Sequence, residues 1–224
     1  MRAFRGLTIA AVLLVIAGDA GAQATRGFKD SWFWGFKGGL LSYQVVDNGN
    51  AKYPFALMGG ADWFITRTNG GLYLSFDHSL LKTDSIWVND SLSPLDSVPR
   101  VVGLKGLRRF TVMGLLFPMQ SYVLKPYIGM GVTLSTIVDA TPQGTYRNAT
   151  QQNLVLNTIE AFRSTATPTF MLGAQMKLPL ISVFGQATAT PANNNFFLFN
   201  GQGFRTTLEA GVRINAGTSV ERTR

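Results

Sequence analysis

The sequence contains no cysteine and one histidine, and charged residues make up only 14% of its 224 residues. Without cysteine, an exported chain has no disulfide framework, so its stability must come from a core or from closed backbone pairing. The shortage of sulfur and imidazole ligands also argues against a transition-metal site, and no cofactor is expected. No run of 18 apolar residues follows the N-terminal segment, so a membrane-spanning helix is not expected. Only strands could carry this chain across a membrane.

The N-terminal segment has the order of a secretory signal peptide. Two arginines precede an apolar run from Leu7 to Ala17, and Ala22-Gln23-Ala24 has the small-x-small form that signal peptidase cleaves. The run is too short to span a bilayer as a helix, and the alternative is a buried N-terminal core helix. We expect residues 1–24 to be a signal peptide and the mature chain to start at Thr25. Cleavage would lower the formal net charge from +8 to +7, because two arginines and one aspartate are lost.

A strict two-residue period runs from Phe204 to Asn215. One face carries the apolar residues and the other carries the charges Arg205, Glu209 and Arg213. A helix would scatter these charges, whereas a strand places successive side chains on opposite faces. In a soluble sandwich the apolar face is buried, but in a membrane barrel the apolar face contacts lipid and the charges lie in the lumen.

The same alternation predicts eight strands in the chain. They cover residues 32–44, 55–66, 72–80, 101–117, 127–138, 169–176, 181–189 and 204–215. Tight turns at 68–71, 118–121 and 177–179 alternate with longer polar connections at 47–52, 82–99, 139–162 and 191–203. Short periplasmic turns and longer extracellular loops are typical of membrane barrels. Trp32, Trp34 and Trp63 lie near the short-turn end, as an interfacial aromatic belt would.

The predicted fold is therefore an all-β, eight-stranded antiparallel transmembrane up-and-down barrel. We expect one barrel domain over residues 25–215, a polar C-terminal tail over 216–224, and both termini in the periplasm. The alternative is a secreted sandwich or a lipocalin-like barrel. The expected location is the outer membrane of a Gram-negative-type bacterium, with the protein a monomer.

The segment Lys125-Pro126-Tyr127-Ile128-Gly129-Met130-Gly131 opens the fifth predicted strand. With this opening and the eight-strand pattern, residues 30–215 resemble the small outer-membrane barrels of the OmpA transmembrane-domain, OmpX and OmpW type. The resemblance implies a barrel that the assembly machinery inserts into the outer membrane. Members of that group often end in an aromatic residue, whereas this strand ends at Ile214-Asn215.

Eight charged residues fall on the polar faces of the predicted strands. They are Lys37, Asp62, Asp77, Lys105, Arg109, Arg205, Glu209 and Arg213. An eight-stranded barrel has just enough interior space for side chains, and a buried charge persists only when it is paired. We interpret these residues as a lumen network that is either a structural salt-bridge core or, as in OmpA-type barrels, a gated path for small solutes. Glu209 is the expected partner of Arg109 or Lys105.

Basic residues gather toward the long-loop end. They are Lys82, Arg100, Lys105, Arg108, Arg109, Arg147 and Arg163. Outer-membrane lipids, and lipopolysaccharide phosphates in particular, are their expected counter-ions. Arg108 interrupts the alternation of its strand, and a β-bulge or a position at headgroup level would accommodate it. Nucleic acid is not an expected partner, because the charges are scattered over an exported strand protein.

Two further features bear on function. The last long connection contains Phe196, Phe197, Leu198 and Phe199, an apolar run that we expect to fold over the barrel mouth, dip into the outer leaflet or pack on other loops. His78 is adjacent to Ser79, and neighbouring strand residues face opposite ways, so a hydrolase triad is not expected. Eight-stranded lipid A deacylases separate the two residues by one position. We expect a non-enzymatic barrel that is structural or interacts through its loops; the alternative is a narrow transporter for small or hydrophobic solutes.

Overall fold

In the computed structural model, strands wrap into one closed barrel. The structure describes residues 28–43, 45–47, 50–90, 98–119, 124–143, 145–146, 148–178, 181–191 and 204–218. The predicted signal peptide, Arg147 and the run from Phe196 to Phe199 lie outside these residues. The barrel strands are β1 (Ser31–Ser42), β4 (Phe55–Thr66), β5 (Gly70–Asp90), β6 (Val98–Leu116), β7 (Leu124–Pro142), β8 (Ser164–Lys177), β9 (Ser182–Pro191) and β10 (Phe204–Thr218).

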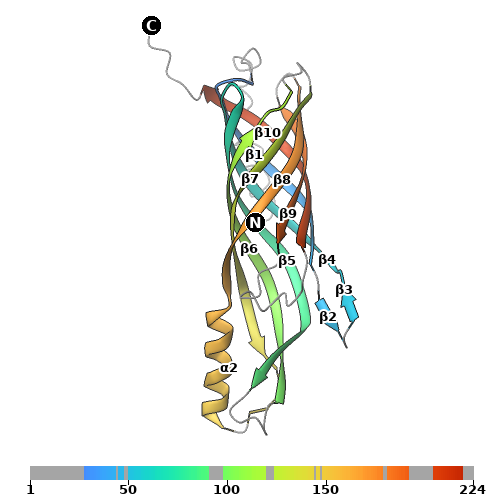
Figure 1. The fold of residues 1–224 in the computed structure, drawn as a ribbon, viewed down its shortest axis with the longest axis vertical. Coiled ribbons are helices and arrows are strands. Elements are labelled where there is room, and N and C mark those ends of the chain that lie inside the picture. The colour runs from blue at the N-terminus through green and yellow to red at the C-terminus, as the bar shows by residue number, and fades with distance from the viewer. Residues whose placement is uncertain are drawn as a thin grey trace, which may run out of the picture.

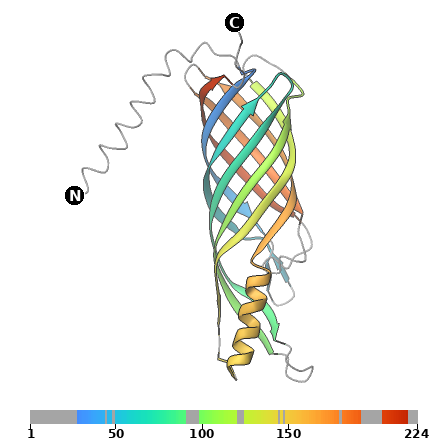
Figure 2. The same ribbon diagram turned by 90° about the vertical axis from the view of Figure 1, so that its left-hand side faces the viewer.

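Each strand pairs antiparallel with its sequence neighbour in the barrel, and β1 pairs with β10 to close it (Figures 1 and 2). The predicted eight-stranded antiparallel barrel is therefore confirmed. Closure leaves the barrel wall without a free sheet edge, which is how a chain without disulfides can satisfy its backbone groups there. Among the described residues, no helix combines the length and the apolar character needed to cross a membrane.

Side chains alternate across the barrel wall as the sequence predicts, with apolar residues outward. In β10, Leu208 is 66% exposed whereas its neighbour Glu209 is 2% exposed. Phe76, Phe110 and Leu134 are cross-strand partners on β5, β6 and β7, and all three are exposed. On the neighbouring strands β1 and β4, Trp34 and Trp63 are partners, with ring centroids 4.4 Å apart. The outside of the barrel is thus an apolar surface and the inside is largely polar.

The two ends of the barrel differ in the length of their connections. At one end the turns are tight: the Arg67 amide donates to the Gly70 carbonyl at 2.7 Å, and the Leu178 amide donates to the Ile181 carbonyl at 2.8 Å. The other end carries a small hairpin of β2 (Val45–Asp47) and β3 (Asn50–Lys52), and the helix α2 (Ala149–Ala161). Figure 2 shows α2 and the ends of β5 and β6 extending well beyond the barrel wall.

This extension corrects two expectations. Residues 82–99 were predicted to be a polar connection, but β5 and β6 stay paired out to Asp90 and Val98. Antiparallel pairing satisfies backbone groups by itself, so polar composition does not prevent it. Residues 139–162 contain α2, whose first turn is capped because the Asn148 side chain accepts a bond from the Gln151 amide at 2.8 Å. At the C-terminal end, β10 continues to Thr218, past the strand end expected at Asn215.

A bulge at Gly106 reverses the faces of the outer part of β6. Gly106 has a φ of 72°, a left-handed conformation, and lies between register pairs on both neighbouring strands. Leu104 and Leu107 are both buried, at 1% and 0% exposure, whereas Lys105 is exposed. The expectation that Lys105 faces the lumen is wrong, because β6 changes face at the left-handed Gly106, opposite which β5 has one more residue between Ser79 and Lys82. Arg108 itself keeps the outward face of Phe110 and Val112, so the bulge does not lie at Arg108.

Replacing Gly106 with alanine is expected to lower the free energy of unfolding by about 1–2 kcal/mol, the cost of a side chain in the left-handed region. The added Cβ would also lie 3.2 Å from the Val138 side chain. The control is Gly114→Ala in the same strand, where a Cβ would meet nothing within 4 Å. Urea titration of the folded protein in detergent measures both. Equal midpoints for the two variants would contradict a strained backbone at Gly106.

Candidate functional site

The barrel interior is the candidate site, and its side chains form three layers. A mainly aromatic group of buried side chains lies near the short turns, and we call it the short-turn cluster. Its members are Phe28, Phe33, Phe64, Tyr73, Met113, Leu115, Phe117, Tyr127 and Met171. Toward the long loops lies the long-loop cluster of Leu41, Tyr43, Ala56, Met58, Leu81, Val102, Leu104, Leu107, Ile137, Val155 and Ile159. Six buried charged residues lie between them: Lys37, Asp62, Asp77, Arg109, Glu209 and Arg213. Arg205 is also buried, level with the long-loop cluster.

Arg213 on β10 forms a two-bond ion pair with Asp62 on β4. Its Nη2 lies 2.8 Å from Asp62 Oδ2 and its Nε donates to Oδ1 at 3.1 Å, and both side chains are fully buried. The guanidinium also lies over the Phe184 ring, 3.7 Å from the centroid, and over the Phe64 ring at 4.4 Å. Gly35 faces this pair, where a Cβ would overlap the Asp62 carboxylate. The glycine therefore provides the room for the ion pair.

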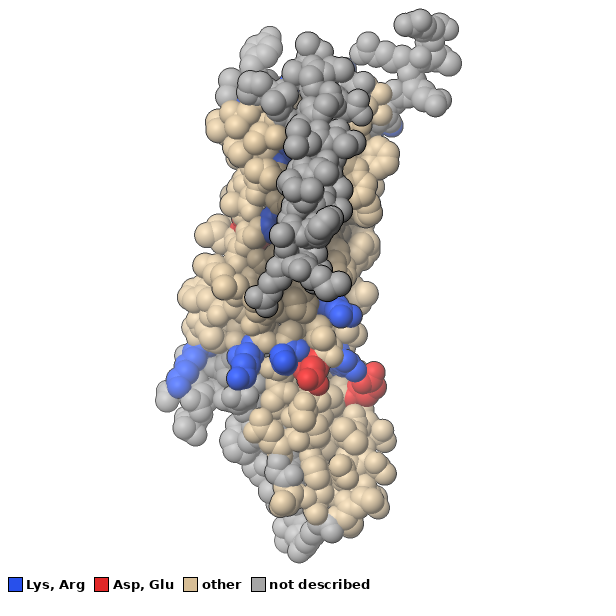
Figure 3. Space-filling view, turned by 180° about the vertical axis from the view of Figure 1, so that it is seen from behind, with Lys and Arg blue, Asp and Glu red and all other residues tan. Residues whose placement is uncertain are grey.

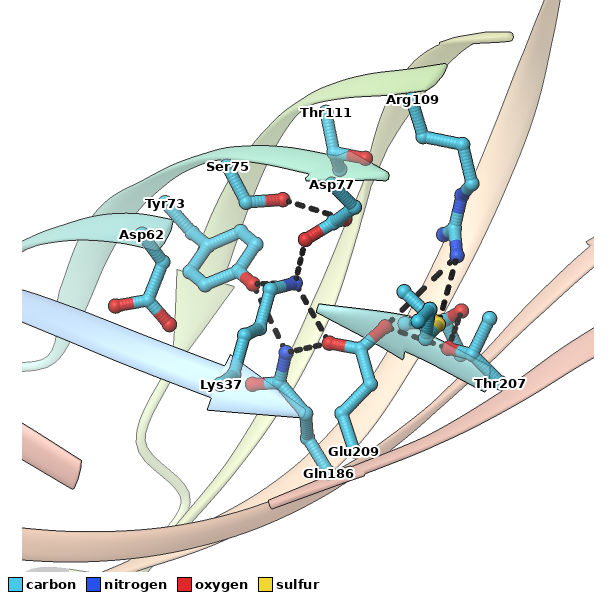
Figure 4. A network of polar contacts seen from close by, with 12 residues as sticks. Lys37, Asp62, Tyr73, Ser75, Asp77, Arg109, Thr111, Gln186, Thr207 and Glu209 are labelled. Carbon is cyan, nitrogen blue, oxygen red and sulfur yellow. Dashed lines mark hydrogen bonds and ion pairs between the residues drawn. The ribbon is translucent and has the colours of Figure 1, made fainter. Parts of the chain in front are cut away.

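Lys37 on β1 is the centre of a second group, seen in Figure 4. Its Nζ lies 2.6 Å from Glu209 Oε2 and 2.8 Å from Asp77 Oδ1, and it donates to the Tyr73 hydroxyl at 2.9 Å. The Gln186 amide nitrogen donates to both Tyr73 at 2.9 Å and Glu209 at 2.7 Å. All three donor positions of the ammonium are thus used, by two acceptors on β5 and one on β10.

Glu209 joins this group to Arg109. The second carboxylate oxygen, Oε1, accepts from the Thr207 hydroxyl at 2.7 Å and lies 3.8 Å from Arg109 Nη1. Of the two partners predicted for Glu209, Arg109 is in place and Lys105 is outside the barrel. Lys37, which the sequence placed on the correct face but did not pair, makes the shorter contact.

A layer of hydroxyl groups continues from the charges on the β6–β10 side. Thr133 bonds to Thr111 at 2.9 Å and accepts from Thr169 at 2.8 Å, and Thr188 and Thr207 are 2.6 Å apart. Arg205 donates to Thr167 within this layer at 3.4 Å. Hydroxyl groups both donate and accept, so they can satisfy one another without added charge.

The basic residues predicted at the long-loop end lie in different environments. Lys82 and Arg108 are exposed on the outer wall, and Arg100 lies in the strand extension of β6. Arg163 is largely used within the fold: its Nε donates to the Ile137 carbonyl at 2.8 Å, its Nη2 donates to the Val138 carbonyl, and its Nη1 pairs with Glu160 at 3.2 Å. It therefore secures the end of β7 next to α2.

The geometry offers no catalytic pair at the histidine. Ser79 is buried inside the barrel at 1% exposure, and its neighbour His78 points to the outer wall, where its cross-strand partner is Arg108. A Ser–His pair needs both groups within hydrogen-bond reach, which opposite faces of one strand forbid. Within the described part of the chain, no group of three or more His, Cys, Asp or Glu residues could hold a metal ion.

The two apolar clusters are the part of the interior that the sequence reasoning missed. Phe33, Phe64, Met113 and Met171 sit at positions that alternation assigns to the inside, so the signal was present. Phe117, which follows β6, also packs inward at 6% exposure. Val155 and Ile159 could not be placed, because their helix lies in a segment read as a loop.

Comparison with known proteins yields structural likeness only. No protein-family model matches the sequence, and no curated protein matches it. The Yersinia pestis attachment invasion locus protein Ail is 8% identical over 83% of this chain and 98% of its own, with a TM-score of 0.44. Neisserial surface protein A is 8% identical over 84% and 99%, with a TM-score of 0.47. A de novo designed transmembrane β-barrel is 12% identical over 85% and 100%, with a TM-score of 0.40.

Proposed function

We propose that this protein is a non-enzymatic outer-membrane β-barrel with a filled, non-conducting interior, which acts as a structural protein of the envelope or through its long loops. The observation that carries the proposal is the inverted barrel wall, apolar outside and charged inside. Exposed apolar patches of this extent are not tolerated in water, whereas a lipid-facing wall requires them. Closed strand pairing also meets the demand that no backbone group be left unsatisfied in hydrocarbon.

The height of the apolar wall supports a membrane location. On β6 the outward residues Leu116, Val112 and Phe110 are exposed and apolar, and Arg108 comes next. Figure 3 shows the tan wall giving way to one row of blue and red side chains near the start of the extension. A sharp change from apolar to charged residues along one strand is expected where hydrocarbon meets headgroups. The tryptophans of β1 and β4 lie at the opposite, short-turn end.

The packing of the interior supports a barrel that does not conduct. Apolar clusters lie on both sides of the charged layer, and Phe28 packs against Phe117 at 5.0 Å between ring centroids in the short-turn cluster. A water path along the β1–β7 side of the interior would have to pass two groups of aromatic and aliphatic side chains, and on the β8–β10 side it would have to pass the hydroxyl layer. Within the charged layer, Lys37 and Arg213 make short ion pairs with carboxylates. This arrangement favours a structural salt-bridge core over a gated solute path.

Location and barrel formation are tested together by fractionation and gel migration. We expect the protein in the outer-membrane fraction, and we expect unboiled samples to migrate differently from boiled samples on denaturing gels. A closed barrel resists detergent until heated because its backbone pairing has no edge at which to open. Identical migration with the protein in the soluble fraction would refute the proposal.

Planar-bilayer recording separates the structural barrel from the alternative of a narrow transporter. The wild-type protein is expected to give no reproducible single-channel steps, because both apolar clusters exclude a water column. A variant that truncates the long-loop cluster, Leu81→Ala with Leu107→Ala, tests whether that cluster contributes to closure; both residues are buried at 1% or less. Reproducible steps from the wild-type protein would favour the transporter.

A further inference from the structure

Three cations stand together on the outer wall where the apolar surface ends. Lys82 on β5 and Lys105 on β6 are direct cross-strand partners, and Arg108 lies on the same wall, opposite His78. We call Lys82, Lys105 and Arg108 the outer cation row. All three side chains are exposed. Among the described residues, none of the three is recorded in an ion pair with a carboxylate, so the row is open to an external anion.

The bulge at Gly106 creates this row. Lys105 and Arg108 are three positions apart, so a regular strand would send them to opposite faces of the wall. With Gly106 in the left-handed conformation, both point outward. Bulges that re-aim a side chain are typical of functional positions in sheets. A strained backbone feature thus moves a lysine from the barrel interior, where it would need a carboxylate, to the membrane-facing side.

The charges around the row do not neutralise it. Asp139 is the partner of Lys105 on β7, and it accepts a bond from the Thr141 hydroxyl at 3.4 Å. The nearby Glu160 pairs with Arg163, which is itself bound to backbone carbonyls of β7. Among the side chains that the structure describes, Asp139 is therefore the one carboxylate that faces these three cations. Like charges placed directly opposite on neighbouring strands destabilise a sheet, so an anion bound between Lys82 and Lys105 would relieve their repulsion.

The residues beside the outer cation row indicate what kind of ligand, besides an anionic group, would fit there. Directly toward the barrel lie the exposed rings of Phe76 and Phe110, which are cross-strand partners, and Leu80 is 67% exposed between the row and these rings. On the other side of Arg108, Thr136 and Ser164 are partners whose hydroxyls are 3.0 Å apart. Cations and hydroxyls above an apolar surface suit an amphiphile with a multiply charged headgroup and acyl chains.

We propose that the outer cation row binds the phosphate groups of lipid A, the phosphorylated glycolipid of the outer leaflet, with its acyl chains against Phe76, Phe110 and Leu80. The proposal rests on the outer-membrane location proposed above. Arg108 provides a planar, two-bond donor for phosphate oxygens, and the two lysines add charge beside it. Lipid A is favoured over a phospholipid because three clustered cations match two phosphates on one headgroup better than a single phosphate.

The test measures binding of lipid A to the folded protein in uncharged detergent micelles by isothermal titration. The variant Lys105→Gln with Arg108→Gln is expected to bind about 30-fold more weakly, which corresponds to about 1 kcal/mol for each interfacial cation removed. The matched control, Lys29→Gln with Arg67→Gln, removes the same charge from exposed residues at the short-turn end and should bind as the wild type does. The unboiled gel shift of each variant shows that the barrel has folded.

Every other outcome of this titration counts against the proposal. Equal weakening in the control would mean that overall charge governs binding. Equally tight binding of dephosphorylated lipid A would remove the phosphates from the argument, and equal affinity for phosphatidylglycerol would point to a general phospholipid site. If inorganic phosphate bound as tightly as lipid A, the apolar surface would contribute nothing to binding. These results are independent of fractionation, so the binding proposal can fail while the outer-membrane location stands.

Discussion

Replacing Arg213 with methionine is expected to lower the free energy of unfolding by about 3–5 kcal/mol, among the largest effects of any single change in the barrel. Methionine keeps much of the volume, so the loss comes from charge. Asp62 would be left as a fully buried carboxylate without its two-bond partner, and the contact with the Phe184 ring would lose its cation. Denaturant unfolding in detergent or lipid, followed by tryptophan fluorescence, measures this change in the free energy of unfolding.

The chain provides a matched control for this change in Arg67, which pairs with Asp30 at 3.9 Å and has a side chain 58% exposed. Arg67→Met should cost less than about 1 kcal/mol, because water screens an exposed pair. Adding Asp62→Asn to Arg213→Met should recover part of the lost stability, since the orphaned charge is then removed. If Arg213→Met costs no more than Arg67→Met, the interior is hydrated and the salt-bridge core is refuted.

Removing the carboxylate of Glu209 should cost about 3 kcal/mol as Glu209→Ala. Glu209 contacts two cations, Lys37 at 2.6 Å and Arg109 at 3.8 Å, and accepts bonds from Thr207 and Gln186. Without Glu209, Lys37 still pairs with Asp77, but among the described residues no other carboxylate lies within ion-pair distance of Arg109. The lost partner therefore leaves a desolvated guanidinium, which is the main source of the cost.

The control for this second change is Glu160→Ala, which removes a carboxylate from an ion pair at 3.2 Å whose glutamate side chain is 71% exposed. Its expected cost is below about 1 kcal/mol. A double-mutant cycle of Glu209→Ala with Lys37→Met isolates the coupling between the two residues, which should exceed that between Glu209 and Arg109. An unchanged unfolding midpoint for Glu209→Ala would show that water, not protein, solvates these charges.

The alternation of apolar and polar residues was sufficient to predict most of the fold. The faces of β1, β4, β5 and β10, including the inward positions of Lys37, Asp62, Asp77, Glu209 and Arg213, follow from a period of two that does not depend on tertiary context. The contrast between tight turns and long connections further predicted which ends of the strands lie together. Local rules suffice here because strand pairing in an up-and-down barrel joins sequence neighbours.

Where pairing departs from strict alternation, the sequence was insufficient. Lys105 was assigned to the interior because its parity is correct for a regular strand, and only the left-handed Gly106 reverses it. Glycine adopts that conformation readily but does not require it, so its presence in β6 did not predict a bulge. The extension of β5 and β6 was missed for a related reason. Its polar composition is equally compatible with a loop and with a paired hairpin.

The sequence by itself determined that this is a closed barrel with apolar residues outside and charged residues inside, because side-chain alternation is a local property of each strand. Only the tertiary structure decided which charges meet. Lys37 and Glu209 are 172 positions apart, and Asp62 and Arg213 are 151 apart; strand register, barrel closure and barrel diameter together bring each pair into contact. These are properties of the whole closed sheet, so no single stretch of sequence encodes them.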